Sequence, residues 1–344
     1  MAALSGGPYR PPTVKDVAAL AGVSPMTVSR TLGGGKSVRP EVQERVLEAV
    51  RTLGYHLNET ASRMRAGQPS GLIGVAITNL GNPYYSKLAI GVEEIAAEHG
   101  RRMLLGNTGE DPVRERQLIA DFLGRRVEGI ILVPAGGDPA HLQRAVLVDT
   151  PLVLASRTVP GIEADAVLLD DVGGAYKGTR TLLEAGHRRI GYLGNVASVF
   201  TGHRRFEGFT MALAEFGLTP DPSLVKRGQQ DVQAARTAME ALLVLPDPPT
   251  AVFSANNRNT IGVLKAIGAL LADAERSDQL PAIVSFDDFE LAEMMPVPVT
   301  VVDHDAGELG RESARMIFAR LTGPGAAGPR RKVEMPTHIM IARP

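Results

Sequence analysis

The chain has 344 residues, of which 44% are hydrophobic and 22% are charged, as in a globular protein with two or three domains. No apolar run approaches the roughly 18 residues of a membrane-spanning helix, and the N-terminal stretch MAALSGGPYRPPTVKD lacks the pattern of a secretory signal. The absence of cysteine excludes disulfides and thiolate metal sites, and the seven histidines form no HExxH-like cluster. We therefore expect a cytoplasmic protein with no metal and no other cofactor.

Charge is distributed unevenly along the chain. The net charge is −1, but residues 1–66 contain nine Lys or Arg against five Asp or Glu, whereas the remainder contains 28 against 33. A basic front end on an acidic body is typical of a nucleic-acid-binding head. A chance fluctuation of surface charge would give the same numbers. The sequence motifs are therefore needed to distinguish a nucleic-acid-binding head from a chance excess of charge.

The segment TVKDVAALAGVSPMTVSRTL, residues 13–32, predicts two short helices joined by a tight turn. Thr13 is a good N-cap because Asp16 follows three residues later, close to a capping box. Gly22 suits a left-handed turn residue, and Ser24 is a second N-cap.

A third helix is expected over residues 40–53, where apolar residues recur at helical spacing before a glycine stop. Three short helices with a glycine in the turn between the first two predict a helix-turn-helix unit. A small helical bundle without a DNA function has the same apolar spacing, and the outer face of the second helix separates the two interpretations.

The second helix carries hydroxyls and one arginine on its outer face, and only Val28 is clearly directed inward. Short hydroxyl side chains can reach phosphates, and Arg30 can bond bidentately to guanine, a contact worth about 1–3 kcal/mol of discrimination. Met26, one turn before Arg30, can touch a thymine methyl. We therefore expect DNA contacts from Thr13, Ser24, Pro25, Met26, Thr27, Ser29 and Arg30.

The linker contains a short segment that can form a helix. Residues 58–66, NETASRMRA, allow about two helical turns that start at Asn58, which is too short for stability alone in water. Within it Met64 lies between Arg63 and Arg65 and has no obvious core to enter. Something outside this segment must therefore hold the helix.

From residue 72 onward, apolar runs such as LIGVAI, GIILVP, IGYLGN and AIVSF alternate with helical patterns. This alternation predicts parallel sheets with helices on both faces, and the length favours two similar halves. Ligands of such sheets bind beyond the carboxyl ends of the strands, here in the cleft between the halves. The expected helices cover residues 84–98, 112–124, 139–147, 173–185, 203–216, 231–244, 258–272 and 305–321.

Polar and aromatic side chains follow several strands at the points where they end. Amides, carboxylates and a guanidinium near aromatic rings suit a polyhydroxylated ligand, whose hydroxyls both donate and accept hydrogen bonds. Ordinary turn or surface roles are the alternative for each residue. The candidates are Asn82, Tyr84, Tyr85, Thr201, Arg205, Asn256 and Asp287.

The same motifs carry a family resemblance. The stretches TVKDVAALAGVSPMTVSRTL, VRPEVQERVLEAVRTLGYHLN and ASRMRAG, then IGVAITNLGNPYYSKLAIGVEE, LLEAGHRRIGYLG, RRFEGF and AVFSANN, stand at family spacing. Over essentially its whole length the sequence resembles the LacI/GalR family of bacterial helix-turn-helix transcription regulators.

The resemblance implies an all-α helix-turn-helix head, a hinge helix, and a doubly wound α/β body with two lobes, like a type I periplasmic binding protein. The body would bind the effector and form the dimer. The expected domains are the head at 1–57, the hinge helix and linker at 58–70, and the body at 71–344, with its first lobe at about 71–169 and 289–302 and its second lobe at about 170–288 and 303–344.

The resemblance also implies roles for the hinge. In the family, the hinge helices of two subunits pair in the minor groove of operator DNA and insert an apolar side chain at the position of Met64. Ser62 here replaces the usual arginine after the hinge alanine, and Leu57 replaces the usual proline before the hinge asparagine. The expected DNA-binding residues of the hinge are Asn58, Arg63, Met64 and Arg65.

In the body, the resemblance makes Arg205 and Asp287 a ligand-binding pair of the second lobe, Asn256 a cleft asparagine, and Tyr84 with Tyr85 an aromatic pair of the first lobe. Gln230 takes a position where some relatives have an aromatic residue that stacks on the ligand. A family Asp-Arg motif reads Ser156-Arg157 here, and His203 and Arg204 add positive charge. A neutral sugar, a sugar acid and a sugar phosphate all remain open as effectors.

These features together predict a homodimeric transcription regulator, a repressor, that binds a pseudo-palindromic operator and is controlled by a sugar-like effector. It would work in the bacterial cytoplasm, at the nucleoid, and effector binding could release or reinforce the DNA complex. No GxSxG, P-loop or strand-following GxGxxG motif suggests an enzyme. The alternatives are a sugar-binding receptor of a transport system and an enzyme of carbohydrate metabolism.

Overall fold

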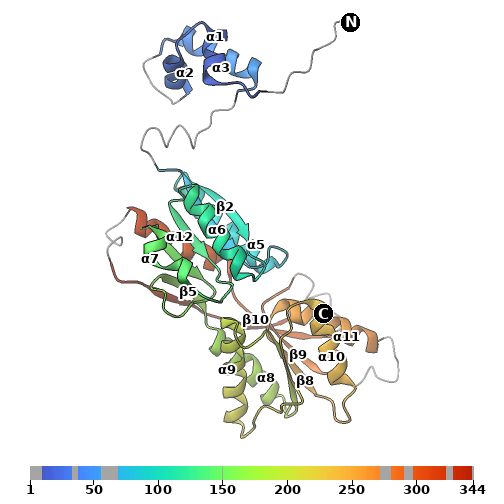
Figure 1. Ribbon diagram of the computed structural model, residues 1–344. Coiled ribbons are helices and arrows are strands. Elements are labelled where there is room, and N and C mark those ends of the chain that lie inside the picture. Colours follow the sequence, from blue (N-terminus) through green and yellow to red (C-terminus); the bar gives the residue numbers. More distant parts are fainter. Residues whose placement is uncertain are drawn as a thin grey trace, which may run out of the picture. The chain divides into compact units, whose positions relative to one another are not determined.

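The computed structural model describes residues 10–32, 38–55, 69–148, 150–271, 280–289, 297–322 and 328–342. The chain divides into two compact units, Met1–Ser70 and Gly71–Pro344, which we call the head and the body (Figure 1). Within the described residues, no helix is both long and apolar enough to cross a membrane.

The head contains the three predicted helices, α1 (Val14–Ala21), α2 (Pro25–Leu32) and α3 (Pro40–Leu53). The predicted capping box is present, because the Thr13 hydroxyl accepts from the Asp16 amide while the Asp16 carboxylate accepts from the Thr13 amide. Gly22 ends α1 at φ 66°, a left-handed conformation that glycine adopts without strain. The core that joins the helices is Val17, Ala18, Ala21, Val28, Val46 and Ala49.

The body contains two six-stranded sheets with the same connectivity. In the first, the strand order is β11-β5-β4-β3-β1-β2, and in the second it is β12-β10-β9-β8-β6-β7. All pairs are parallel except β10 with β12, which are antiparallel. In each sheet the order reverses next to the first strand, and such a switch point is where ligands of doubly wound sheets bind.

The strands of the first sheet are β1 (Leu72–Ile77), β2 (Arg102–Asn107), β3 (Gly129–Leu132), β4 (Leu152–Ala155), β5 (Asp165–Leu169) and β11 (Lys332–Met335). Those of the second are β6 (Ile190–Gly194), β7 (Val225–Arg227), β8 (Ala251–Ser254), β9 (Ala282–Phe286), β10 (Val299–Asp303) and β12 (His338–Ala342). The short strands β7, β11 and β12 were not among the predicted apolar runs.

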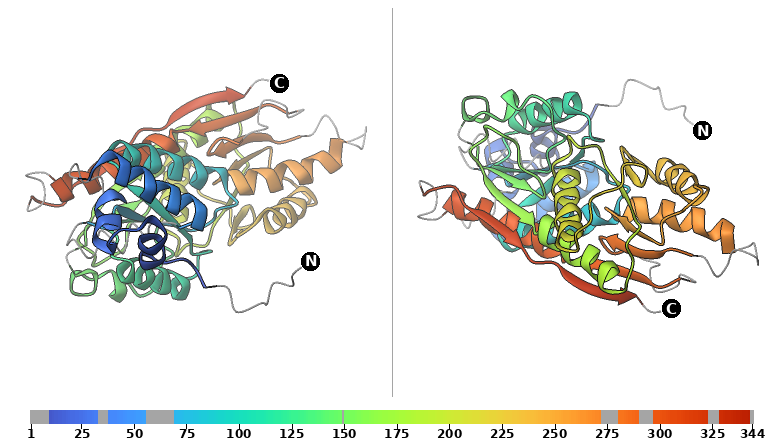
Figure 2. Two further views of the ribbon diagram at one scale, coloured as in Figure 1. Left: turned by 90° about the horizontal axis from the view of Figure 1, so that it is seen from above. Right: turned by 90° about the horizontal axis from the view of Figure 1, so that it is seen from below.

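Helices cover both faces of each sheet (Figures 1 and 2). In the first lobe, α5 (Pro83–Glu98) packs against α12 (Ala306–Thr322), and α6 (Pro112–Gly124) lies on the other face. In the second lobe, α8 (Asp171–Glu184) packs against α9 (Phe200–Glu215), and α10 (Val232–Leu243) against α11 (Asn257–Leu271). The helix expected over 139–147 forms instead as a 3₁₀ turn, Ala140–Leu142, and a single turn α7, Arg144–Leu147.

Close packing of α5 on α12 depends on glycine. A Cβ on Gly91 would lie 2.0 Å from the carbonyl oxygen of Gly307, and a Cβ on Gly310 would lie 2.0 Å from that of Leu88. Because real Cβ atoms do not approach backbone so closely, these glycines let the two helices touch through their main chains. The late helix α12 is thereby held firmly in the first lobe.

This placement corrects the expected lobe boundaries. Strand β10 lies in the second sheet, although residues 289–302 were assigned to the first lobe, and α12 and β11 belong to the first lobe, although 303–344 were assigned to the second. The chain therefore crosses between the lobes after β5, after β10 and after β11. An apolar strand pattern identifies a strand but does not say which of two similar sheets it joins.

Candidate functional site

Two surfaces hold the predicted site residues: the outer face of α2 in the head and a cavity between the lobes of the body. In α2, the Ser24 hydroxyl accepts from the Thr27 amide at 3.1 Å and lies 2.9 Å from the Thr27 hydroxyl. The Ser24 side chain therefore caps the N-terminus of α2, as predicted. Val28 is the buried residue of α2, which leaves the opposite face free for contacts.

Most of the other predicted contact residues of α2 are exposed. Met26 is 69% exposed, and Pro25, Ser29 and Arg30 are also exposed. Arg30 makes no hydrogen bond or ion pair within the described part of the head, so its five donors are available. Thr13 lies at the start of α1, where its side chain is occupied by the capping box. The predicted hinge residues Asn58, Arg63, Met64 and Arg65 lie outside the described residues.

The cavity in the body opens where strands of both sheets end and helices begin, and the centres of water-sized molecules can occupy about 80 Å³ of it. The loops after β1, β4, β6, β8 and β9 all reach it. All eight predicted effector residues line this cavity: Asn82, Tyr84, Tyr85, Thr201, Arg205, Gln230, Asn256 and Asp287. The expected position at the carboxyl ends of the strands is therefore where the structure brings them together.

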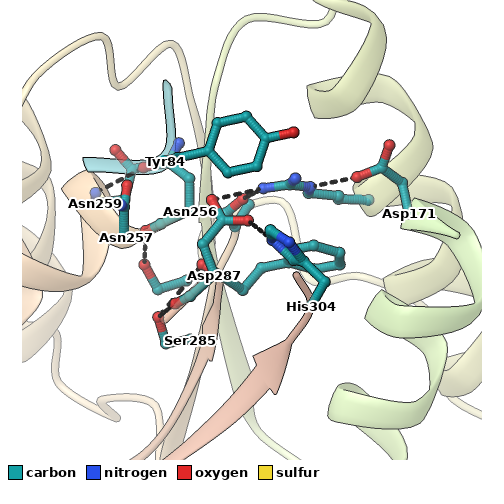
Figure 3. A network of polar contacts seen from close by, with 12 residues as sticks. Tyr84, Asp171, Asn256, Asn257, Asn259, Ser285, Asp287 and His304 are labelled. Carbon is teal, nitrogen blue, oxygen red and sulfur yellow. Dashed lines mark hydrogen bonds and ion pairs between the residues drawn. The ribbon is translucent and has the colours of Figure 1, made fainter. Parts of the chain in front are cut away.

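Arg205, on α9, makes several hydrogen bonds in the second-lobe wall. Figure 3 shows the neighbouring residues Asp171, Asp287 and His304. Nε of Arg205 donates to Asp171 Oδ1 at 2.7 Å, and its Nη1 donates to the Ala255 carbonyl at 2.7 Å and to Asp287 Oδ2 at 3.3 Å. The guanidinium also lies 3.7 Å from the centre of the Phe286 ring, a cation–π contact. These contacts fix the plane and position of the guanidinium at the cavity wall.

Asp287 follows β9 and accepts on both oxygens, from Arg205 and, at 2.9 Å, from His304 Nε2. Burial raises its pKa, but the charge of Arg205 and the hydrogen bond from His304 lower it more and hold the pKa at about 2. Burial also raises the pKa of Asp171, against the charge of Arg205. At neutral pH the cavity wall therefore presents an ionised Asp287 beside a permanently charged Arg205.

The first-lobe wall is formed by two tyrosines and a second buried arginine. The Tyr84 hydroxyl lies 2.6 Å from the Ser156 hydroxyl, and the rings of Tyr84 and Tyr85 meet edge to face at 5.0 Å. Arg157 bonds to both oxygens of Glu110, at 2.7 and 2.8 Å, and also to the Tyr85 hydroxyl at 3.3 Å. Burial raises the pKa of Tyr84, so its hydroxyl stays protonated as a donor.

Three residues at the cavity have a strained backbone. Glu110, Ser156 and Asp287 have φ values of 63°, 63° and 69°, in the left-handed region that non-glycine residues rarely adopt. Such strain costs about 1–3 kcal/mol per residue and accumulates at ligand sites, where it aims side chains that the fold would otherwise direct elsewhere.

A buried hydrogen bond and an ion pair between described residues join the lobes beside the cavity. Asn82, which caps α5 through the Tyr84 amide, also accepts from Asn257 Nδ2 at 2.8 Å, and this bond is buried. At the edge, Arg204 Nη2 lies 3.0 Å from Glu334 Oε1. Asn256 Oδ1 accepts from the Asn259 amide and so caps α11, which leaves its amide nitrogen for other partners.

The structure also changes parts of the predicted site. His203 and Arg204 do not line the cavity: His203 is exposed, and Arg204 is paired with Glu334. The prediction missed Asn79, Glu110, Asn195 and Arg258, which also line the cavity. Polar residues after β6 and at the start of α11 were visible as signals, whereas nothing near Glu110 in the sequence points to Arg157.

Comparisons with known proteins match both units. Residues 13–58 match the family of bacterial regulatory proteins, lacI family, and residues 70–341 match the periplasmic binding proteins and sugar binding domain of the LacI family. The chain is 30% identical to the HTH-type transcriptional repressor CytR of Escherichia coli (strain K12). This match spans 317 residues and covers 90% of each chain. It is 31% identical over 338 residues to the HTH-type transcriptional regulator CelR of Thermobifida fusca, covering 96% of this chain and 98% of that one.

Among solved structures, a transcriptional regulator CelR–cellobiose complex superposes with a TM-score of 0.70 at 28% identity and covers 96% of this chain and 98% of that chain. The family match extends over most of the sequence and includes both the helix-turn-helix head and the two-lobed body. The chain therefore belongs to the lacI family of bacterial regulatory proteins and is a DNA-binding regulator of transcription.

Proposed function

We propose that this protein is a homodimeric repressor whose affinity for operator DNA is set by a small polyhydroxylated effector bound between the lobes of the body. The observation that carries the proposal is the cavity between the lobes, which all eight expected effector residues line. The CelR–cellobiose complex supports a sugar-like ligand for a relative of this chain. The protein acts in the cytoplasm at the nucleoid and has no catalytic turnover.

In the head, the exposed face of α2 enters the major groove. Ser24, Thr27 and Ser29 contact phosphates, and Pro25 and Thr13 lie against the backbone where α2 and α1 begin. Arg30 has no partner among the described residues and is free to bond to guanine, while Met26, 69% exposed, is placed to contact a thymine methyl. A dimer would present two such helices to the two halves of a pseudo-palindromic operator.

The hinge couples the head to the body. Residues 58–66 are too short to form a stable helix alone, so DNA and the partner hinge complete it. Met64 then wedges between base pairs in the minor groove, with Arg63 and Arg65 on its charged walls. Operator binding and hinge folding thereby become one equilibrium, which the body can shift.

In the cleft, donors and acceptors suit sugar hydroxyls. Arg205 and Asn256 donate, Asp287 accepts, and Tyr84 and Tyr85 offer ring surface to apolar sugar faces. Because residues from both lobes line one cavity, a bound effector favours one arrangement of the lobes over another. Linkage then requires effector and operator to change each other's affinity by the same factor. The coupling free energy that corresponds to this factor is typically about 1–3 kcal/mol.

A binding titration with operator-like palindromes tests the DNA function. We expect sequence preference and an affinity that falls steeply with salt, because phosphate contacts release counterions. Arg30→Ala is expected to relax base preference by about 1–3 kcal/mol, whereas Met64→Gly weakens operator binding and leaves effector binding intact. Binding without sequence preference or salt dependence would overturn the regulator assignment.

A thermal-shift screen of sugars, sugar acids and sugar phosphates tests the effector function. A true effector at roughly 100 times its dissociation constant adds about 2.7 kcal/mol to the free energy of unfolding. The same compound is then added to the operator titration: an inducer weakens DNA binding and a corepressor strengthens it. A compound that is chemically converted by the purified protein would instead indicate an enzyme.

A further inference from the structure

Three guanidinium groups line the cavity between the lobes, from Arg157, Arg205 and Arg258. The first two are already neutralised. Arg157 bonds to both oxygens of Glu110, and Arg205 is paired with Asp171 and Asp287. Because the carboxylates beside them offset their positive charges, these two arginines attract a charged ligand only weakly.

The carboxylates at the cavity are equally satisfied. Both oxygens of Glu110 accept from Arg157, one oxygen of Asp287 accepts from Arg205, and the other accepts from His304. No carboxylate among the described lining residues is left without a cationic or imidazole partner. A negatively charged ligand would therefore meet compensated carboxylates rather than free ones.

Arg258 is different. It is the second residue of α11 (Asn257–Leu271), it is partly buried, and it makes no hydrogen bond or ion pair with any described residue. A guanidinium offers five donors in a fork that matches a carboxylate or a phosphate. In a confined cavity such a cation is attracted to an anion more strongly than it would be on an open surface.

The neighbouring start of α9 (Phe200–Glu215) adds to the preference for an anion. Thr201 and Gly202 line the cavity, and the N-cap residue Val199 provides no side-chain acceptor for the amides of the first turn. At the two other helix starts on this cavity, the side chains of Asn82 and Asn256 accept from first-turn amides. Unsatisfied amides at a helix start favour negative charge.

We propose that the effector is a sugar derivative with one anionic group, a carboxylate or a phosphate, and that Arg258 is the residue that selects for this group. This inference rests on the proposed effector site and names the chemical class that the site accepts. Arg205, Asp287 and the tyrosines hold the hydroxylated part, and Arg258 pairs with the acid. A neutral sugar leaves this guanidinium without a partner inside the closed cleft.

Calorimetric titration of the purified full-length protein tests the proposal with matched probes. The probes are glucose and galactose, their aldonic and uronic acids, and their 6-phosphates. We expect at least one acid or phosphate to bind about tenfold or more tightly than its neutral parent, because an ion pair with Arg258 is a charge-assisted hydrogen bond. Whether acids or phosphates bind distinguishes the two sources of the anionic group.

Variants then assign the selectivity to one residue. Arg258→Gln is expected to abolish the preference, so that the anionic probe binds no more tightly than its neutral parent, while Arg258→Lys retains part of the preference. Lys265→Gln, on the exposed side of the same helix, removes one positive charge outside the cavity and serves as the control. Thermal unfolding without ligand shows that the variants are folded.

The outcomes separate this inference from the proposed function. If neutral sugars bind and alter operator affinity while the anionic probes do not, the selectivity of Arg258 is refuted and the effector site stands. The same holds if Arg258→Gln binds the anionic probe as tightly as the unaltered protein. If no probe of any class binds or changes operator affinity, both the inference and the sugar-effector function fail.

Discussion

Two buried arginines face the same cavity from opposite lobes, but their counter-ions differ. Arg205 and Arg157 have nearly equal side-chain exposure, 7% and 6%. The carboxylates beside Arg205 are themselves buried, at 0% for Asp171 and 8% for Asp287, whereas Glu110 beside Arg157 is 43% exposed. The contacts of Arg205 therefore lie inside the fold, whereas the carboxylate paired with Arg157 remains in contact with water.

The difference follows from topology. Asp171 comes directly after the crossover from β5, Asp287 follows β9, and His304 follows β10 at the next crossover. The hydrogen bonds of Arg205 and Asp287 therefore tie together the strand ends where the chain passes between lobes. Glu110, by contrast, lies on the loop between β2 and α6, at the edge of the first sheet, and its side chain is 43% exposed.

The largest effect is expected for Arg205→Gln. This change leaves two buried carboxylates without a cation, and breaking a buried pair in this way costs about 3–5 kcal/mol. We expect the free energy of unfolding, measured with urea, to fall by that amount and effector binding to be lost. Arg236→Gln, which removes an exposed pair with Glu240 on α10, should change stability by less than about 0.5 kcal/mol. Equal losses for the two variants would contradict the distinction.

Acid titration should give the next largest effect through Asp287. Its pKa is about 2 in the folded protein against an ordinary 3.8, so ionised Asp287 stabilises the fold above pH 4 and this contribution disappears as the pH falls through 2. The difference corresponds to about 2 kcal/mol. In Asp287→Asn we expect lower stability at pH 7 and a smaller loss between pH 4 and pH 2, measured by denaturant titration at each pH. Parallel curves for the two proteins would show that the pair with Arg205 is not the cause.

Arg157→Gln should affect binding more than stability. After this change, the exposed carboxylate of Glu110 can be hydrated by water. Nε of Arg157 has no partner among the described residues, so the other hydrogen bonds lost are those to the Pro134 carbonyl and the Tyr85 hydroxyl. We expect a loss of about 1–2 kcal/mol in the free energy of unfolding. Affinity for the effector should fall about tenfold, because a donor on one wall is removed. A stability loss as large as that of Arg205→Gln would make the two walls equivalent.

How much the sequence predicts also differs between the two regions. In the head, the decisive contacts are local: Thr13 with Asp16, and Ser24 with Thr27, are three residues apart, and their pattern can be read directly. The body depends on contacts between distant residues, such as Asn82 with Asn257 and Arg205 with Asp287. Strand-end positions predicted that these residues share a cavity, because parallel strands present their carboxyl ends on one side.

The sequence could not predict which charged side chains form ion pairs with each other. The pairs of Arg157 with Glu110 and of Arg204 with Glu334 depend on the exact path of loops and crossovers, and periodicity carries no information on that path. For the same reason the late elements β10, α12 and β11 were assigned to the wrong lobes. His203 and Arg204 were expected to add charge near the cleft on the basis of sequence position alone, whereas Arg258, two residues after the predicted Asn256, was not predicted.

The smallest effect is expected for Arg204→Gln, which tests whether an ion pair between the lobes needs burial to matter. Arg204 and Glu334 lie 3.0 Å apart but are 29% and 42% exposed, so water screens their attraction. A double-mutant cycle with Glu334→Gln should give a coupling free energy below about 1 kcal/mol for unfolding. Because the pair spans the lobes, any change in effector affinity is limited to the same amount. A coupling of several kcal/mol would mean that lobe arrangement is controlled at this rim rather than by the buried contacts of Arg205, Asp287 and Asn82.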